Sequence, residues 1–418
     1  MSLALAAYRA ATGLAEPVAP LLLRRRASRG KEDPARLDER LGHASADRPA
    51  GPLVWVHGAS VGETLSALPL VERIGRERPG VTVLVTSGTR ASADLLRPRL
   101  PPFAVHQYVP IDAPGAAARF LDHWRPDLLV LLESELWPNL LLQAKARGCR
   151  LALVSARITD HSAEGWSRLK GAARRLLSGF DLILTQDDLS AQRLETLGAT
   201  VQGRANLKLV GSPLEHDRGE FERLSSAMGD RAVVVSASTH TGEEALADEA
   251  VARLPDRPLH IIAPRHPARA DAIEAERMLA GRSVARRSRG EALAPDVDVY
   301  LADTLGELGL FFRLADVVVL GGGWTEGVGG HNPLEPARLG KATVSGPSVG
   351  NWRCVFAGMV EADAVRLAEP SQLAEVVGDL LAHPDEASAL GERGRAFARR
   401  EDGALDRLWA QLRPLVPA

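Results

Sequence analysis

This chain of 418 residues has few cysteines, few aromatic residues and almost no excess of charge of either sign. Its two cysteines, Cys149 and Cys354, lie far apart, which excludes a disulfide framework or a zinc site and fits a reducing compartment. Aromatic residues make up 4% of the chain and the net charge is −2, so a nucleic-acid partner is not expected. The remaining composition, 45% hydrophobic and 25% charged, is typical of a soluble globular protein.

Metal-binding motifs are missing as well. No predicted helix carries paired histidines, and Asp296 and Asp298 run into a predicted strand instead of a loop. We therefore expect neither a metal nor another cofactor. Transfer chemistry would then depend on arginine, lysine and helix dipoles to hold a leaving phosphate.

A long uninterrupted apolar run is also lacking, although the N-terminus comes close. Residues 1–23 are mostly Ala, Leu, Val and Pro, but an arginine, a glutamate and two prolines interrupt them, so a spanning helix is not favoured. The arginines at 24–26 follow the apolar run, which is the reverse of the order in a signal peptide. We expect residues 1–26 to associate with a membrane surface. The alternative is an ordinary amphipathic helix packed on the protein.

Predicted strands and helices alternate along the rest of the chain, which indicates an α/β protein with parallel, doubly wound sheets. The pattern loosens between 201 and 218, and the length suits two domains. We expect Rossmann-like domains at 27–212 and 213–418, with the last helix able to pack back on the first domain and ligands in a cleft between them. Strands are predicted at 53–57, 81–86, 105–110, 128–132, 150–155, 182–185, 232–236, 259–263, 297–301, 317–320 and 342–345.

The stretch 317–347 contains the clearest candidate for a binding site. An apolar strand leads into three glycines and then into a predicted helix start with Asn332 as the N-cap and Pro333 as the first helical residue. Free backbone N–H groups at such a start favour a phosphate, and Glu335 could accept hydrogen bonds from a ribose. The alternative is a tight turn whose glycines serve only backbone geometry.

The turn His57–Glu63 joins the first predicted strand to the first helix and allows two catalytic interpretations. Gly58 to Gly62 match the G-x-S-x-G nucleophile elbow, with Ser60 as the nucleophile of a serine hydrolase. Alternatively, Glu63 is a general base whose carboxylate takes a proton from an attacking hydroxyl. A purely structural interpretation also exists, in which Glu63 only complements the helix dipole.

Polar residues follow several other predicted strands. Glu133 comes directly after the most apolar strand, where a carboxylate rarely serves packing. Lys208 lies near the domain boundary and could bring positive charge to the cleft. In the second domain, Arg265 and His266 end a strand with a group suited to a phosphate or carboxylate.

Six motifs together resemble the Kdo (3-deoxy-D-manno-octulosonic acid) transferases of lipopolysaccharide synthesis. The likeness runs from about 53 to 347, and ELWPN with GGHNPLE is its most specific part. The motifs are HGASVGE (57–63), ESELWPN (133–139), NLK (206–208), APRHP (263–267), LGEL (305–308) and GGHNPLEPA (329–337).

The resemblance implies a GT-B fold and an inverting glycosyltransferase that moves Kdo from a CMP-Kdo donor to a lipid A precursor, without a metal. It implies a location at the cytoplasmic face of the bacterial inner membrane, either peripheral or anchored by the N-terminus. Glu63 is similar to the family's proton acceptor, and Glu133 and Lys208 to its transition-state stabilisers. The positions that match its CMP-binding residues are Arg265, His266, Gly306, Glu307, Leu308, Asn332, Pro333, Leu334 and Glu335.

Two rival functions stay open at this stage, besides a non-enzymatic membrane scaffold. One is another GT-B enzyme, such as a UDP-sugar transferase or an epimerase, and the other is a serine hydrolase that uses Ser60. The chain departs from the family in its interrupted N-terminal segment and in the sequence Gly323–Trp324–Thr325 within the glycine loop.

Overall fold

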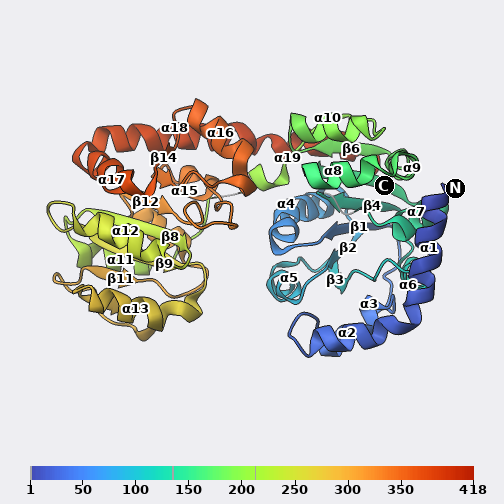
Figure 1. Ribbon diagram of the computed structural model, residues 1–418, viewed down its shortest axis with the longest axis horizontal. Coiled ribbons are helices and arrows are strands. Elements are labelled where there is room, and N and C mark those ends of the chain that lie inside the picture. The colour runs from blue at the N-terminus through green and yellow to red at the C-terminus, as the bar shows by residue number, and fades with distance from the viewer. Residues whose placement is uncertain (1, 134–135, 212) are drawn as a thin grey trace. The chain divides into compact units, whose positions relative to one another are not determined.

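The computed structural model describes residues 2–133, 136–211 and 213–418 (Figure 1). The chain forms two compact units, the first made of Met1–Gly211 with Asp402–Ala418 and the second of Ser212–Glu401. Each unit is built on a parallel sheet of seven strands with helices packed on it. The predicted α/β class with doubly wound parallel sheets is therefore confirmed.

The first sheet has the strand order β3-β2-β1-β4-β5-β6-β7 and every pairing in it is parallel. Its central strands are buried on both faces, since β4 is apolar at every position and β1 is apolar from Leu53 to Val56, as parallel sheets require. In β1, Leu53 and Trp55 contribute to one core and Val54 and Val56 to the other. The strands are β1 Leu53–Gly58, β2 Thr82–Ser87, β3 Ala104–Tyr108, β4 Leu128–Leu132, β5 Arg150–Ala156, β6 Leu182–Thr185 and β7 Gly203–Arg204.

Helices cover both faces of this sheet. The last of them, α19 (Ala404–Leu412), comes from the C-terminus of the chain, and its residues Leu408, Trp409 and Leu412 are buried in the core that holds Val54 and Val56. The other helices are α1 Leu3–Ala15, α2 Ala19–Ala27, α3 Leu37–Arg40, α4 Val61–Glu77, α5 Arg90–Leu96, α6 Pro114–Trp124, α7 Pro138–Ala146, α8 Asp160–Ser167, α9 Lys170–Leu177 and α10 Asp188–Thr196.

The N-terminal helix α1 is attached to the first unit through polar contacts with α6 and α7. The Glu16 carboxylate accepts a hydrogen bond from the backbone N–H of Gly115 at 2.8 Å, and the Tyr8 hydroxyl donates to Asp112 at 3.0 Å. Many of its apolar side chains nevertheless face outward, with Leu3 90% and Leu14 83% exposed. Within the described residues, no helix combines the length and the apolar character that crossing a membrane requires.

The second sheet has the order β10-β11-β9-β8-β12-β13-β14 and is also parallel throughout. Its strands are β8 Val233–Thr239, β9 Leu259–Pro264, β10 Val284–Arg286, β11 Val299–Leu301, β12 Val317–Leu320, β13 Ala342–Ser345 and β14 Arg366–Leu367. Its helices are α11 Arg218–Met228, α12 Glu243–Ala252, α13 Ala270–Leu279, α14 Leu308–Leu314, α15 Leu334–Arg338, α16 Arg353–Glu361, α17 Leu373–Ala382 and α18 Pro384–Asp402.

The attachment of α19 to the first unit can be tested with Leu408→Ala. The Leu408 side chain is 1% exposed within the core, so its truncation leaves a cavity and should lower the free energy of unfolding by about 2–5 kcal/mol. The matched control is Arg413→Ala, because Arg413 is exposed and lies just beyond the same helix. This substitution should change the free energy of unfolding by less than about 0.5 kcal/mol. Urea unfolding of the full chain measures both, and equal effects would contradict the packing described.

Candidate functional site

In the first unit, the carboxyl ends of the parallel strands share one edge of the sheet, and the predicted catalytic residues lie there. Ser60 is the N-cap of α4 and accepts a hydrogen bond from the Glu63 backbone N–H at 3.3 Å. The Glu63 carboxylate accepts from the Ser60 hydroxyl at 2.7 Å and from the Ala59 backbone N–H at 2.8 Å. It is 9% exposed. These donors hold the carboxylate in a fixed orientation at the start of α4.

The same contacts count against Ser60 as a hydrolase nucleophile. Its hydroxyl donates to Glu63, and within the described residues no imidazole forms a hydrogen bond with it. The nearest histidine in sequence, His57, is buried and pairs through Nδ1 with the Thr86 hydroxyl at 2.8 Å. A serine triad therefore has no counterpart in the described part of this edge.

Glu133 and Lys208, distant in sequence, form an ion pair at this edge. Glu133 follows β4 directly, and Lys208 lies in the short 3-10 helix η4 (Leu207–Leu209) after β7. Gln186, at the end of β6, donates its side-chain N–H to the same carboxylate oxygen of Glu133 at 3.3 Å. The two side chains are only 16% and 21% exposed, so little solvent screens the pair.

Backbone geometry at the ends of β4 and β5 accounts for this meeting. Glu133 has φ of 57° and Ser155 has φ of 54°, a left-handed conformation that residues with a Cβ rarely adopt. The β5–β6 register shifts near Ser155. The Ser155 hydroxyl oxygen accepts a hydrogen bond from the Leu207 backbone N–H at 2.9 Å and so fixes the segment that carries Lys208. Strained residues of this kind persist where the surrounding structure holds them, often at functional sites.

The rest of the ESELWPN motif is structural where it can be described. Ser134 and Glu135 lie outside the described residues. The Trp137 ring stands edge-on to the His57 ring, 6.1 Å between centroids, and so links the loops after β1 and β4. Asn139 is buried and donates its side-chain N–H to the backbone oxygen of Asp112 at 2.7 Å.

In the second unit, the glycine loop after β12 is held by one carboxylate. Glu243, at the start of α12 and 3% exposed, accepts hydrogen bonds from three backbone N–H groups: Gly322 at 2.7 Å, His240 at 3.0 Å and Trp324 at 3.0 Å. Gly322 has φ of 77°, and a Cβ there would lie 2.8 Å from the ring of His331. Only glycine fits that position.

Trp324, which the sequence left without an explanation, is an anchor of this loop. Its indole N–H donates to the backbone oxygen of Ala368 at 2.8 Å, and its backbone N–H donates to Glu243. The residue therefore ties the loop after β12 both to α12 and to the segment after β14.

Three histidines and an arginine gather beside this loop. The rings of His240 and His331 are stacked, with centroids 5.2 Å apart and Nε2 atoms separated by 2.9 Å, and the His266 ring lies 5.8 Å from that of His240. Burial, the charge of Arg265 and the neighbouring imidazoles lower the pKa of His331 to about 4. Arg265 is exposed and forms no ion pair with any described residue. Its guanidinium and these imidazoles offer donors to an anion.

The helix after this loop begins later than expected. Asn332 and Pro333 were predicted as the N-cap and first helical residue, but Pro333 is the cap and α15 begins at Leu334. Asn332 still serves the helix start, because its side-chain oxygen accepts from the Leu334 backbone N–H at 3.0 Å. Its side-chain N–H donates to Glu335 at 3.3 Å, and burial raises the pKa of that carboxyl.

The LGEL motif forms the turn that leads into α14. The helix begins at Leu308, Glu307 is its N-cap and Gly306 turns with φ of 86°. Both carboxylate oxygens of Glu307 are engaged within the unit, by Arg287 at 2.6 and 3.1 Å and by Thr304. Its side chain therefore shapes the turn, and the hydrogen bonds from Arg287 lower its pKa.

Sequence reasoning missed several residues of these two edges. Glu243 looked like an ordinary first-turn acid, and only the fold shows that it holds the loop. Gln186 and Ser155 carried no motif at all. His331 lies in the GGHNPLEPA motif, but its stacking on His240 depends on the path of two loops that are far apart in sequence.

This chain is similar to known proteins both in fold and in sequence. The solved structure of a glycosyltransferase from Rickettsia africae ESF-5 superposes with a TM-score of 0.60 over 88% of this chain and 99% of that one, at 10% identity, which shows a shared GT-B fold. At this identity the likeness shows the fold alone, and the class of enzyme, a glycosyltransferase, is established by the sequence relatives that follow.

The family follows from sequence. A family model described as 3-Deoxy-D-manno-octulosonic-acid transferase (kdotransferase) matches residues 35–210. A probable mitochondrial 3-deoxy-D-manno-octulosonic acid transferase of Arabidopsis thaliana is 34% identical over 90% of this chain and 88% of its own. The 3-deoxy-D-manno-octulosonic acid transferase of Bordetella pertussis is 37% identical over 88% and 89%. The chain belongs to the 3-deoxy-D-manno-octulosonic acid transferase family.

The role of Glu243 can be tested with Glu243→Ala. The substitution leaves three buried N–H groups without their acceptor and should lower the free energy of unfolding by about 3–5 kcal/mol. Glu249→Ala on the same helix removes an exposed glutamate and serves as the control. Chemical denaturation measures both, and a change below about 1 kcal/mol for Glu243→Ala would show that the loop does not depend on it.

The depressed pKa of His331 predicts acid sensitivity. Its pKa of about 4 in the fold lies below the unfolded value of 6.5, so the unfolded chain binds more protons between these pH values. The contribution of His331 to the free energy of unfolding is thus fully present above pH 6.5. It is lost as the pH falls towards 4, and the loss is at most about 3 kcal/mol. The free energy of unfolding is measured by calorimetry at pH 7 and pH 4.5. His331→Gln should make this free energy differ less between the two pH values than it does in the unaltered chain. The exposed-site control His383→Gln should leave that difference unchanged.

Proposed function

We propose that this member of the family transfers Kdo from CMP-Kdo to a hydroxyl of a lipid A precursor, with inversion at the anomeric carbon. The observation that carries the proposal is the ion pair between Glu133 and Lys208, formed at the strand ends beside Glu63 in the turn after the neighbouring strand β1. A structural ion pair needs no strained backbone, whereas Glu133 and Ser155 both adopt left-handed geometry where this pair is assembled.

Glu63 is proposed as the proton acceptor. Its carboxylate takes the proton of the acceptor hydroxyl while that oxygen forms a bond to the anomeric carbon of Kdo. The bond from the anomeric carbon to the phosphate oxygen breaks, and CMP leaves with the electron pair. The Ser60 hydroxyl and the Ala59 N–H hold the carboxylate in one orientation, so little reorganisation is needed at the moment of transfer.

Lys208 and Glu133 are proposed to stabilise the transition state. The ammonium of Lys208 can offset negative charge that develops on the donor, and Glu133 with Gln186 fixes its position. Removing Glu133 would leave the lysine without its partner carboxylate, so the two residues should act as one unit in kinetic measurements.

The nucleotide is proposed to bind in the second unit. Arg265 and His266 would receive the phosphate, supported by the loop that Glu243 holds. The turn Gly306–Leu308 and the segment Asn332–Glu335 would contact the remainder of CMP, through backbone N–H groups at the starts of α14 and α15 and through the Glu335 carboxyl.

Contact with a membrane surface is proposed for the N-terminal segment, because the acceptor is a lipid. Among the described residues, six of the fourteen exposed large hydrophobic side chains fall within the first 22 positions. Arginines occupy the last turn of α2, where they suit anionic head groups. We place the protein peripherally at the cytoplasmic face of the inner membrane. The residues of this apolar set are Leu3, Tyr8, Leu14, Val18, Leu21 and Leu22.

The proposal is tested by incubating the chain with CMP-Kdo and a lipid A precursor and identifying the lipid product by mass spectrometry. Glu63→Gln keeps the shape of the side chain but removes its basicity, and should lower turnover by about 10²–10⁴-fold. Calorimetric affinity for CMP should stay nearly unchanged, because the nucleotide is assigned to the other unit.

Glu72→Gln is the matched control, since Glu72 is an exposed glutamate of the same helix α4. Turnover by Glu63→Gln equal to that of this control would refute Glu63 as the base. Absence of a Kdo-bearing product with the unaltered chain would refute the substrate assignment itself.

A further inference from the structure

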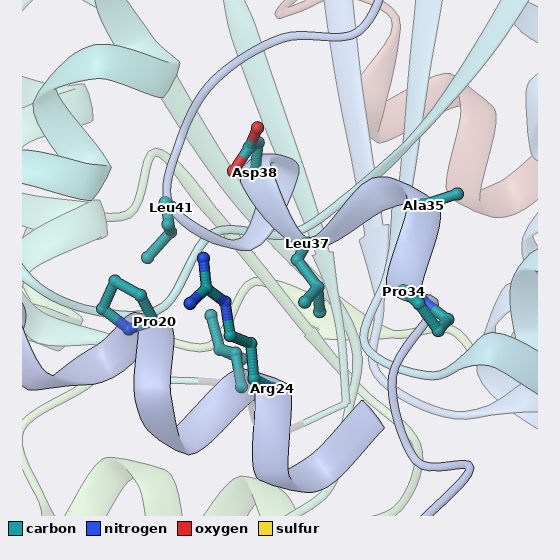
Figure 2. Close-up of a pocket in the computed structure, with 8 residues that line it drawn as sticks. Pro20, Arg24, Pro34, Ala35, Leu37, Asp38 and Leu41 are labelled. Carbon is teal, nitrogen blue, oxygen red and sulfur yellow. The ribbon is translucent and has the colours of Figure 1, made fainter. Parts of the chain in front are cut away.

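A small pocket lies between α2 and the segment that leads into α3, and its lining includes none of the residues of the two sites described above (Figure 2). Its volume is about 200 Å³. Proline and leucine side chains form most of the wall, and one arginine and one aspartate complete it. The lining residues are Pro20, Leu23, Arg24, Pro34, Ala35, Leu37, Asp38 and Leu41.

The two charged residues of this pocket, Arg24 and Asp38, are exposed, and their side chains have no partner among the described residues, in contrast to two nearby glutamates. Glu32 pairs with Arg26 at 2.8 Å, and Glu39 pairs with Arg36 at 2.7 Å. Within the described residues, neither Arg24 nor Asp38 forms an ion pair or a side-chain hydrogen bond, although a cation and an anion line the same hollow. Figure 2 shows the Arg24 guanidinium extending from α2 toward the segment that carries Asp38. The pocket thus offers one site for an anion and another for a cation.

The surroundings of the pocket are those of a lipid-facing surface. Pro20, Leu23 and Arg24 are spaced i, i+3 and i+4, so they share one side of α2. Between them, Leu21 and Leu22 project outward with 68% and 55% exposure. Apolar side chains beside a polar pocket would enter the acyl region while the pocket stays at the level of the head groups.

We propose that this pocket binds the phosphoethanolamine head group of a membrane lipid, with the phosphate on Arg24 and the ammonium on Asp38. A simple anion would meet repulsion from Asp38, and a simple cation would meet repulsion from Arg24, whereas a zwitterion satisfies both. The proposal rests on the membrane contact proposed above and gives that contact a lipid partner. It assigns no part in the transfer reaction to either residue.

The test measures binding of the full chain to vesicles by sedimentation. The vesicles are made of phosphatidylcholine alone, of equal parts phosphatidylcholine and phosphatidylethanolamine, and of equal parts phosphatidylcholine and phosphatidylglycerol. Phosphatidylethanolamine should raise the affinity about fivefold over phosphatidylcholine alone, the factor that corresponds to one added hydrogen bond between the ammonium and Asp38. The ammonium group of phosphatidylethanolamine can donate hydrogen bonds to Asp38, whereas the trimethylammonium group of phosphatidylcholine has no N–H to donate.

Arg24→Gln and Asp38→Asn should each abolish this increase. Arg25→Gln removes the same charge from the same turn of α2 outside the pocket lining, and should keep the increase. With phosphatidylglycerol, Arg24→Gln and Arg25→Gln should weaken binding alike, because diffuse charge governs that contact. Asp38→Asn should not weaken binding to phosphatidylglycerol.

Two results would overturn the head-group site: no increase with phosphatidylethanolamine, or an equal loss of that increase in Arg24→Gln and Arg25→Gln. Kdo transfer to a detergent-dispersed acceptor, measured on the same preparations, separates this outcome from failure of the proposed function. All three variants should retain that transfer, since none of the substituted residues belongs to the proposed catalytic or nucleotide-binding groups.

Discussion

Parallel strand pairing is the constraint on which both candidate sites depend. In each sheet every strand runs in the same direction, so all carboxyl ends reach one edge, and the loops that leave them bring distant residues together. Glu133 and Lys208 meet for this reason, as do His240 and His331. A single antiparallel strand at the centre of either sheet would send its loop to the opposite edge.

Polar anchors beneath the two edges make these loops specific. In the first unit, the Ser155 hydroxyl receives the Leu207 backbone N–H and positions the segment of Lys208. In the second, the buried Glu243 carboxylate receives three backbone N–H groups from the loops after β8 and β12. Both anchors satisfy backbone donors that would otherwise be buried without a partner, so the same hydrogen bonds that stabilise the fold also orient the site.

The N-terminal segment shows how one stretch can be docked and still face outward. Glu16 and Tyr8 attach it to α6 and Asp112 through hydrogen bonds, which demand little apolar burial. Leu5 and Leu23 are buried, but four leucines, at positions 3, 14, 21 and 22, remain exposed to water, which is unfavourable for apolar side chains. One face of these helices therefore packs on the protein, and the opposite, apolar face is the one for which membrane contact is proposed.

The sequence by itself determined the parallel α/β sheets, since strands such as Leu128–Leu132 are apolar at every position and alternate with helices. It also determined the family, because ELWPN and GGHNPLE are specific enough to identify it. The helix start at Leu334 was misplaced by one residue, because capping depends on local backbone angles that composition does not report. Only the tertiary structure decided that Glu133 pairs with Lys208, that Glu243 holds the glycine loop and that Trp324 anchors it, because these contacts join segments far apart in the chain.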